Sequence, residues 1–440
     1  MTHKSLLKVD ARTKKRNAAE KRFKTYGFAA IIVSMLALVT LLTSVIGTGA
    51  SAFKQTYATV TVQLPEDKLD KSGVRDIDVM KKVTTIGYAK ILNQGLTKSV
   101  AATGIATELS TKDIWGMLSK EAAATIRDHI LANPDLIGQE VTLDLLMNGR
   151  TDGYFKGRVT MESAALDSNT SPEELALAQA LADADIVHTK FNWAFLTNPD
   201  ASDQRPEAAG LGVAILGSLY MMIIVLVVSL PIGVAASIYL EEFAPKNRWT
   251  DLIEVNISNL AAVPSIVYGI LGLAIFINFM EFNQSSPLVG GLVLSLMTLP
   301  RIIIPARAAL KSVPPSIRDA ALGVGASKMQ SVFHHVLPLA APGILTGVII
   351  GLGQALGETA PLLLIGMVAF VREYPAAYTP DAGLFGEAST ALPVQVFNWT
   401  QRADPGFVER ASGAIITLLI FLLIMNAVTI FLRRKFERRW

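Results

Sequence analysis

Residues 210–240 read GLGVAILGSLYMMIIVLVVSLPIGVAASIYL, a stretch without a charged side chain. A helix needs about 20 apolar residues to cross the hydrocarbon core of a bilayer, so this stretch is long enough to span it. Further uncharged runs occupy residues 27–53, 255–280, 282–300, 336–357 and 411–432. The sequence therefore predicts an all-α polytopic membrane protein with six transmembrane helices.

The composition agrees with a membrane protein. Hydrophobic residues make up 51% of the 440 residues and charged residues only 18%, below the roughly 25% charged residues of ordinary soluble proteins. The absence of cysteine excludes disulfides, thiolate metal sites and cysteine nucleophiles. His334 and His335 are adjacent and do not share a helix face, so we expect no metal site there.

The distribution of charge predicts the orientation of the chain. Residues 1–26 carry nine Lys/Arg and two acids, and residues 433–440 carry five Lys/Arg and one acid. By the positive-inside rule both termini are cytoplasmic. Residues 51–209, with 16 basic and 22 acidic residues, then form an extracytoplasmic insert. Basic segments beside a span set topology and contact membrane lipid, and no other feature indicates nucleic-acid binding.

The chain divides into five predicted parts: a basic tail at 1–26, a first transmembrane helix at 27–50, the insert at 51–209, a five-helix block at 210–432 with a cytoplasmic loop at 307–342, and a second tail at 433–440. The insert is predicted to be mixed and helix-rich. Its patterns indicate a strand at 57–64 and helices at 76–92, at 112–132 and from Ser171-Pro172 onward.

The end of the first apolar run has two interpretations. Ala50-Ser51-Ala52 has the small-residue pattern of a signal-peptide cleavage site. The apolar run before it is longer than the 7–15 residues of a signal-peptide core. We therefore expect a retained membrane anchor.

The cytoplasmic loop contains the most specific pattern, DAALGVG at 319–325 followed by VLP at 336–338. The pattern predicts a helix, a sharp turn at Gly325, and a second helix that Pro338 stops. Its small residues suit docking into a groove on a partner protein; the alternative is a solvated amphipathic loop. The residues expected to form this site are Asp319, Ala320, Ala321, Gly323, Gly325, Leu337 and Pro338.

This pattern resembles the EAA-loop motif of the permease subunits of bacterial ABC importers. Asp319 stands at the position of the motif's glutamate, and His335 at the position of its isoleucine. Together with the surrounding sequence, the motif resembles the PstA branch of phosphate importers in four stretches: LAAVPSIVYGILGL (260–273), LKSVPPSIRDAALGVGASK (310–328), LPLAAPGIL (337–345) and GETAPLLL (357–364). The resemblance covers about residues 210–432 and is less specific for the insert.

The resemblance implies a type I ABC importer permease fold in the bacterial inner membrane. It implies a second, PstC-like permease, two PstB-like ATPases that bind ATP and Mg, and a periplasmic, PstS-like phosphate-binding protein. The chain itself would bind no cofactor and would not be an enzyme. Its sequence agrees, because the G-x-x-x-x-G-K-[ST] phosphate loop of ATPases is absent.

Glu358 is the candidate gate of the translocation path. A carboxylate within a membrane span should face a cavity, the bundle interior or a partner; the alternative is a neutral packing residue. The family pattern commonly has arginine four residues earlier, where this chain has Gln354. We therefore expect a second permease to supply the counter-charge. Thr359 adjoins this site.

Three other residues are candidates for the path. Arg301 could meet phosphate near the inner mouth, since arginine matches phosphate geometry; the alternative is an arginine reaching the membrane interface. Pro264 and Ser265 break the helical pattern of residues 255–280 and could expose carbonyl groups to the path; the alternative is a simple kink.

Phosphate itself is chosen by the resemblance alone, so a permease for another oxyanion remains an alternative. A basic tail, one span and an outer domain would also suit a membrane sensor, but that layout does not explain the five later spans. A secondary transporter or membrane enzyme would favour several intramembrane charges and internal repeats, which the sequence lacks.

Overall fold

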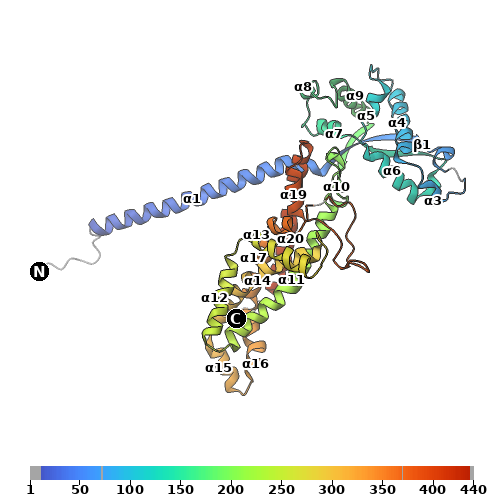
Figure 1. Cartoon of the computed structure of the whole chain (residues 1–440). Coiled ribbons are helices and arrows are strands. Elements are labelled where there is room, and N and C mark those ends of the chain that lie inside the picture. Colours follow the sequence, from blue (N-terminus) through green and yellow to red (C-terminus); the bar gives the residue numbers. More distant parts are fainter. Residues whose placement is uncertain (1–10, 71–72, 369, 437–440) are drawn as a thin grey trace. The chain divides into compact units, whose positions relative to one another are not determined.

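The computed structural model describes residues 11–70, 73–368 and 370–436 (Figure 1). The chain forms two compact units, residues 1–48 and residues 49–440. The first unit consists, in its described part, of helix α1 (Ala11–Gly49), which ends one residue into the second unit. Helix α1 contains residues 27–49 of the predicted span at 27–50, and its apolar part is long enough to cross a membrane.

The insert is built around a three-stranded antiparallel sheet in the order β2-β1-β3. Its strands are β1 (Lys54–Gln63), β2 (Glu140–Leu146) and β3 (Val187–Phe191). In the register, Tyr57 lies opposite Leu146 and Lys54 opposite Phe191. The strand predicted at 57–64 is therefore confirmed, with an earlier start.

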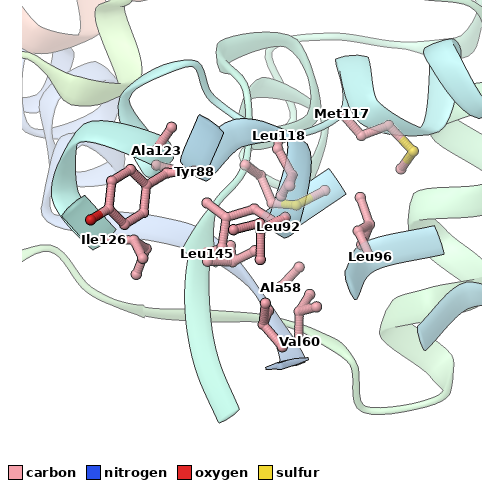
Figure 2. Packing of buried hydrophobic residues seen from close by; sticks show 14 of the residues in the cluster. Ala58, Val60, Tyr88, Leu92, Leu96, Met117, Leu118, Ala123, Ile126 and Leu145 are labelled. Carbon is pink, nitrogen blue, oxygen red and sulfur yellow. The ribbon is translucent and has the colours of Figure 1, made fainter. Parts of the chain in front are cut away.

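One face of the sheet packs against α4 (Thr85–Ala102) and α6 (Glu121–Ala132). Successive strand residues point to opposite faces, so Ala58 and Val60 are buried while Thr59 and Thr61 lie on the other face. Figure 2 shows Val60 together with Leu92, Leu96 and Ile126 in this core. The insert thus has its own hydrophobic core.

Two helices predicted in the insert are each broken. The pattern at 112–132 forms α5 (Thr111–Gly116) and α6, because Leu118 pairs with Met147 beside the sheet and the segment leaves the helix. The pattern at 76–92 forms α3 (Ile77–Met80) and α4. In contrast, the predicted start at Ser171 is confirmed: its hydroxyl accepts from the Glu174 N–H and caps α9 (Pro172–Asp183).

The remaining elements of the insert are short. The helices are α2 (Glu66–Leu69), α7 (Gly149–Phe155), α8 (Met161–Ala164) and α10 (Trp193–Thr197). Single 3₁₀ turns cover Ala50–Phe53, Pro134–Leu136 and Pro206–Ala208.

The rest of the second unit is a helical bundle. Its long helices are α11 (Gly212–Ile238), α14 (Pro287–Ser312), α17 (Leu337–Gly357) and α20 (Gly406–Phe436). Its shorter helices are α12 (Arg248–Ala261), α13 (Ser265–Gly272), α15 (Pro315–Gly323), α16 (Lys328–Ser331), α18 (Ala360–Leu364) and α19 (Leu392–Thr400). A small hairpin pairs β4 (Tyr378–Thr379) with β5 (Gly383–Leu384).

Helix α14 is the centre of the bundle and packs against both α11 and α17. Figure 1 shows α15 and α16 at the end of the bundle that lies away from α19 and from the insert. Among the described residues, five helices are long and apolar enough to cross a membrane, and a bent pair would make a sixth. The prediction of six transmembrane helices agrees with this structure when the bent pair is one span.

That bent pair corrects the simple helix expected from residues 255–280. Helix α12 ends at Ala261, and the chain turns by 103° before Ser265–Phe279 continues it. Pro264, which has no N–H, lies at the bend and precedes the first turn of α13. The predicted irregularity at Pro264 is therefore confirmed, but it is a sharp bend and not a kink within one helix.

Two further boundaries differ from expectation. Pro338 does not stop a helix: the helical segment continues from Lys328 to Gly357. A π-helical turn at Val332–Val336 displaces the hydrogen-bond register just before Pro338, so the missing N–H is tolerated there. The segment between the last two spans also holds α19, and α20 begins at Gly406, before the uncharged run at 411–432.

Candidate functional site

The backbone is interrupted at Glu358, inside a part of the chain that is otherwise helical. Helix α17 ends at Gly357, and Glu358 adopts an extended conformation with φ −78° and ψ 127° before α18 begins at Ala360. At membrane depth, irregular backbone is tolerated where it is buried in protein or lines a cavity. Glu358 therefore lies at a point where a polar path could pass.

Arg301 of α14 is the cation nearest to this carboxylate. Its Nη1 atom lies 4.0 Å from Glu358 Oε1, and both side chains are about one-fifth exposed, at 20% and 18%. Nη1 is itself buried and has no hydrogen-bond partner among the residues that the structure describes. The two groups neutralise each other electrostatically, but the guanidinium keeps an unused donor.

This pair provides a counter-charge within the chain itself, in addition to any that the expected second permease would supply. The sequence shows no cation near Glu358 because Arg301 lies on another helix, 57 positions earlier in the chain. Packing of α14 against α17 and α18 brings the two groups together. The positive charge that Glu358 needs is therefore present on this chain, at Arg301.

The other predicted path residues differ in their exposure. Thr359 is half-buried next to Glu358, whereas Gln354 is exposed on α17. Ser265 is half-buried and Pro264 exposed, at the bend before α13, which packs against α14 and α18. Among the described residues, no hydrogen bond or ion pair joins these four to Arg301 or Glu358.

The loop at 307–342, which is predicted to be cytoplasmic, forms the expected helix and glycine turn. Helix α15 ends at Gly323, and Gly325 has φ +91°, a conformation that side-chain-bearing residues rarely adopt. The amide of Ala326 then donates to the carbonyl of Ala321, which closes the turn. The turn at Gly325 is therefore confirmed.

The loop's exposed surface differs from the one expected. Ala321 is buried, so it packs inside the loop and does not belong to a docking face. Asp319, Ala320 and Gly323 are exposed, while Leu337 and Pro338 are half-buried. The surface carries large apolar residues that the sequence pattern did not single out: Leu322, Val324, Met329 and Phe333.

Arg318 fastens this loop to the bundle. Its guanidinium donates to Glu242 Oε1 at 2.6 Å and to the carbonyl of Leu310 at 2.9 Å. Glu242 lies in the π-helical turn that extends α11, and its side chain is only 7% exposed. Since α15 is tied both to α11 and to the end of α14, a displacement of the loop is transmitted to two spans.

Two family models match the chain. "Binding-protein-dependent transport system inner membrane component" matches residues 229–440, and a domain of unknown function, DUF3333, matches residues 10–165. The probable ABC transporter permease protein YqgI of Bacillus subtilis is 32% identical over 228 residues, which cover 50% of this chain and 76% of that protein. The chain belongs to the ABC transporter permease family.

Other relatives of this permease carry more specific names. The phosphate transport system permease protein PstA of Mycobacterium leprae is 30% identical over 245 residues, covering 54% of this chain and 75% of that protein. PstA 1 of Mycobacterium tuberculosis strain H37Rv is 28% identical over 232 residues, covering 53% and 72%. A solved structure of the MetNI methionine ABC transporter aligns with a TM-score of 0.38 and 15% identity, over 52% of this chain and 95% of that one.

Family membership fixes the general role of the chain. It is a multi-pass membrane permease with the PstA-like type I permease architecture predicted from the sequence, and it works with an ATPase and a substrate-binding protein. A transport role is favoured over a membrane sensor, because the named relatives are transport permeases.

In this permease, buried charges join the insert to α20, a feature that the sequence did not reveal. Lys156 Nζ lies 2.7 Å from Asp152 Oδ2 and 2.9 Å from Glu409 Oε1, and all three side chains are at most 4% exposed. Burial lowers the pKa of Lys156, while Asp152 opposes that effect. No local pattern could pair residues this far apart in sequence.

Arg410 completes the junction. Its guanidinium donates to Gln55 Oε1 at 2.7 Å and to the carbonyl of Glu207 at 2.9 Å, and the residue is 2% exposed. Removing one partner of a buried ion pair typically costs about 3–5 kcal/mol, because the other charge stays buried. The insert and the start of α20 are therefore held together firmly.

Glu207 makes this junction sensitive to pH. Burial raises the pKa of Glu207, although the hydrogen bond from Ser119 opposes the shift. Ionisation is thus less favourable in the folded chain than in the unfolded chain. The protonated carboxyl contributes stability below its unfolded-state pKa, and this contribution is lost as pH rises through the higher folded-state pKa.

We expect Glu207→Gln to leave the melting temperature of the detergent-solubilised chain unchanged or higher at neutral pH. The amide oxygen can still accept from Ser119 Oγ, which lies 2.6 Å from Glu207 Oε1. Melting temperatures measured between about pH 5 and 8 should fall less with rising pH than in the wild type. The exposed Glu108 provides a control, since Glu108→Gln should not change the profile. A Glu207→Gln profile as steep as the wild-type profile would contradict the prediction.

Proposed function

We propose that this permease translocates inorganic phosphate into the bacterial cytoplasm. Its similarity to proteins named phosphate transport system permease protein PstA carries the choice of substrate. The guanidinium of Arg301, which is half-buried and whose buried Nη1 has no hydrogen-bond partner among the described residues, supports an anionic substrate. Permeases for other oxyanions remain the alternative, because an arginine recognises any tetrahedral oxyanion by the same hydrogen bonds.

The proposed mechanism uses the Arg301–Glu358 pair as a gate. Glu358 alone would repel phosphate, and Arg301 alone would hold it tightly. With both present, an incoming phosphate competes with the carboxylate for the guanidinium and is released when the carboxylate returns. The 4.0 Å separation favours this exchange, since no direct hydrogen bond has to be broken. Thr359, Gln354, Pro264 and Ser265 would border the same path.

The energy for transport would come from partner subunits. We propose a heterodimer with a PstC-like permease, two PstB-like ATPases on the cytoplasmic side, and a PstS-like phosphate-binding protein outside. ATP and Mg would be bound by the ATPases, and this chain would have no ATPase site of its own. The loop at 307–342 would dock on an ATPase, and its apolar surface at Leu322 and Val324 supports that role.

In the proposed orientation, in the bacterial inner membrane, the tails at 1–26 and 433–440 are cytoplasmic and the insert at 51–209 is periplasmic. The span at 27–50 and the block at 210–432 would cross the membrane between them. Figure 1 is consistent with this arrangement inside the second unit, because α15 and α16 lie at the opposite end of the bundle from the insert.

Cysteine labelling should reveal this orientation, since the chain has no cysteine of its own. We expect Leu166→Cys, at a side chain that is 92% exposed in the insert, to react with a membrane-impermeant maleimide in intact spheroplasts. Met329→Cys, 58% exposed in the cytoplasmic loop, should react only after permeabilisation. The opposite pattern would reverse the proposed orientation.

The substrate can be tested by uptake. A strain that lacks only this subunit should lose high-affinity uptake of radiolabelled phosphate and regain it when the chain is restored. Excess arsenate, which resembles phosphate, should compete, and excess sulfate or molybdate should not. Competition by sulfate or molybdate with no effect of arsenate would assign the permease to another oxyanion.

A further inference from the structure

A row of aromatic side chains leads from the interior of the junction to the outside of the insert. The ring of Phe195 lies 5.3 Å from that of Phe53, which lies 6.3 Å from Phe191, and Phe191 lies 4.7 Å from Trp193. Phe195 is buried at 1% exposure, whereas Phe191 is 50% and Trp193 67% exposed. The row therefore ends in two large aromatic side chains that no described part of the chain covers.

The depth of this row relative to the membrane follows from α20. Gly413 of α20 packs directly against the buried end of the row. A Cβ atom added to Gly413 would lie only 2.6 Å from Ala52 Cβ and 2.9 Å from Phe195 Cζ. The uncharged run of α20 begins at Ala411, two residues before Gly413. With a rise of about 1.5 Å per residue, the buried end of the row lies within a few ångströms of the start of the hydrocarbon core.

The first span gives the same depth independently. The strand that carries Lys54 begins directly after the 3₁₀ turn Ala50–Phe53, which follows the end of α1 at Gly49. Four residues in a 3₁₀ turn advance only about 8 Å. Lys54, which is exposed and lies opposite Phe191 in the sheet, is thus close to the membrane end of that span.

We propose that Phe191 and Trp193, together with Lys54, form an interfacial anchor that binds the phospholipid headgroup region. Tryptophan prefers the membrane–water interface because its ring is apolar and its N–H can bond to polar groups. A lysine at this depth can extend its ammonium group to lipid phosphates. Phospholipid is the favoured occupant because two separate chain segments place the aromatic pair at headgroup depth.

The anchor has a mechanical consequence. The insert is already fixed to α20 by the buried charges at Lys156 and Arg410. A second contact, with lipid, prevents the insert from tilting about that junction. The insert would then keep one orientation above the membrane while the bundle helices move.

Spin labelling of the full chain in phospholipid nanodiscs tests the anchor. Single cysteines would be placed at Trp193, at Leu166 as an aqueous control, and at Leu423, 66% exposed on α20, as a membrane control. Oxygen concentrates in the bilayer and a nickel complex in water, so the ratio of their collision rates with the label reports depth. We expect the ratio at Trp193→Cys to exceed that at Leu166→Cys several-fold and to remain below that at Leu423→Cys, because the headgroup region lies between water and the hydrocarbon core.

Two results would overturn the proposal. The first is a ratio at Trp193→Cys equal to that at Leu166→Cys, which would place the side chain in water. The second is loss of access to both reagents when the complete complex is assembled, which would mean that a partner protein covers the aromatic pair. A high ratio that persists in the assembled complex supports lipid contact.

Discussion

Replacing Glu358 by glutamine should reduce the maximal rate of phosphate uptake about tenfold or more, which corresponds to ~1.4 kcal/mol or more in the rate-limiting barrier. Glutamine keeps the shape of the side chain but removes the charge that opposes Arg301, 4.0 Å away. Phosphate should then bind more tightly and leave more slowly. The KM for uptake should therefore fall together with the maximal rate.

Arg301→Gln should shift the KM in the opposite direction. Without the guanidinium, the path retains a carboxylate that repels phosphate, so the KM should rise and the maximal rate should fall. Opposite KM shifts separate a gate from a packing role, since loss of packing at either position would weaken transport without this pattern. Both variants should be measured in proteoliposomes that contain the complete complex.

Glu373→Gln provides a matched control, because it removes the same charge at a side chain that is exposed and lies outside the candidate spans. This variant should leave KM and maximal rate close to those of the wild type. Normal uptake kinetics in Glu358→Gln would identify Glu358 as a packing residue and contradict the gate.

Features that depend on local composition could be predicted from the sequence. The uncharged run at 210–240 predicts a span because length and apolarity suffice for that inference. The cap at Ser171 and the turn at Gly325 are also local, since each depends on a few neighbouring residues. These elements are present in the structure as predicted.

Features that depend on tertiary packing could not be predicted. The cation beside Glu358 comes from Arg301 on another helix, and Lys156 meets Glu409 across 253 positions of sequence. The helix expected at 112–132 breaks because residue Leu118 pairs beside a strand that is distant in sequence. In each case a long-range contact outweighs a local pattern.

Val324→Asp should uncouple ATP hydrolysis from transport. Val324 is 86% exposed at the tip of the loop at 307–342, so an aspartate there has no folding cost within this chain. In the assembled complex it would place a charge in an apolar docking contact, where an unpaired charge is costly. The complex should then lose most phosphate uptake, together with the stimulation of ATPase activity by the loaded binding protein.

Gly325→Pro should produce the same defect by a different route. Proline fixes φ near −65°, whereas Gly325 requires +91°, so the loop cannot close its turn. Ala321→Leu is expected to act differently, because Ala321 is buried and a larger side chain should destabilise the loop itself. Its effect should therefore appear as a lower melting temperature as well as poorer coupling.

Leu166→Asp is the matched control for Val324→Asp. It introduces the same charge at an apolar side chain that is 92% exposed, but in the insert and not in the loop. Uptake and ATPase control should remain normal in this variant, and membrane insertion should be normal in both. If Val324→Asp transports phosphate as well as Leu166→Asp does, the exposed tip of the loop is not the surface that couples the permease to its ATPase.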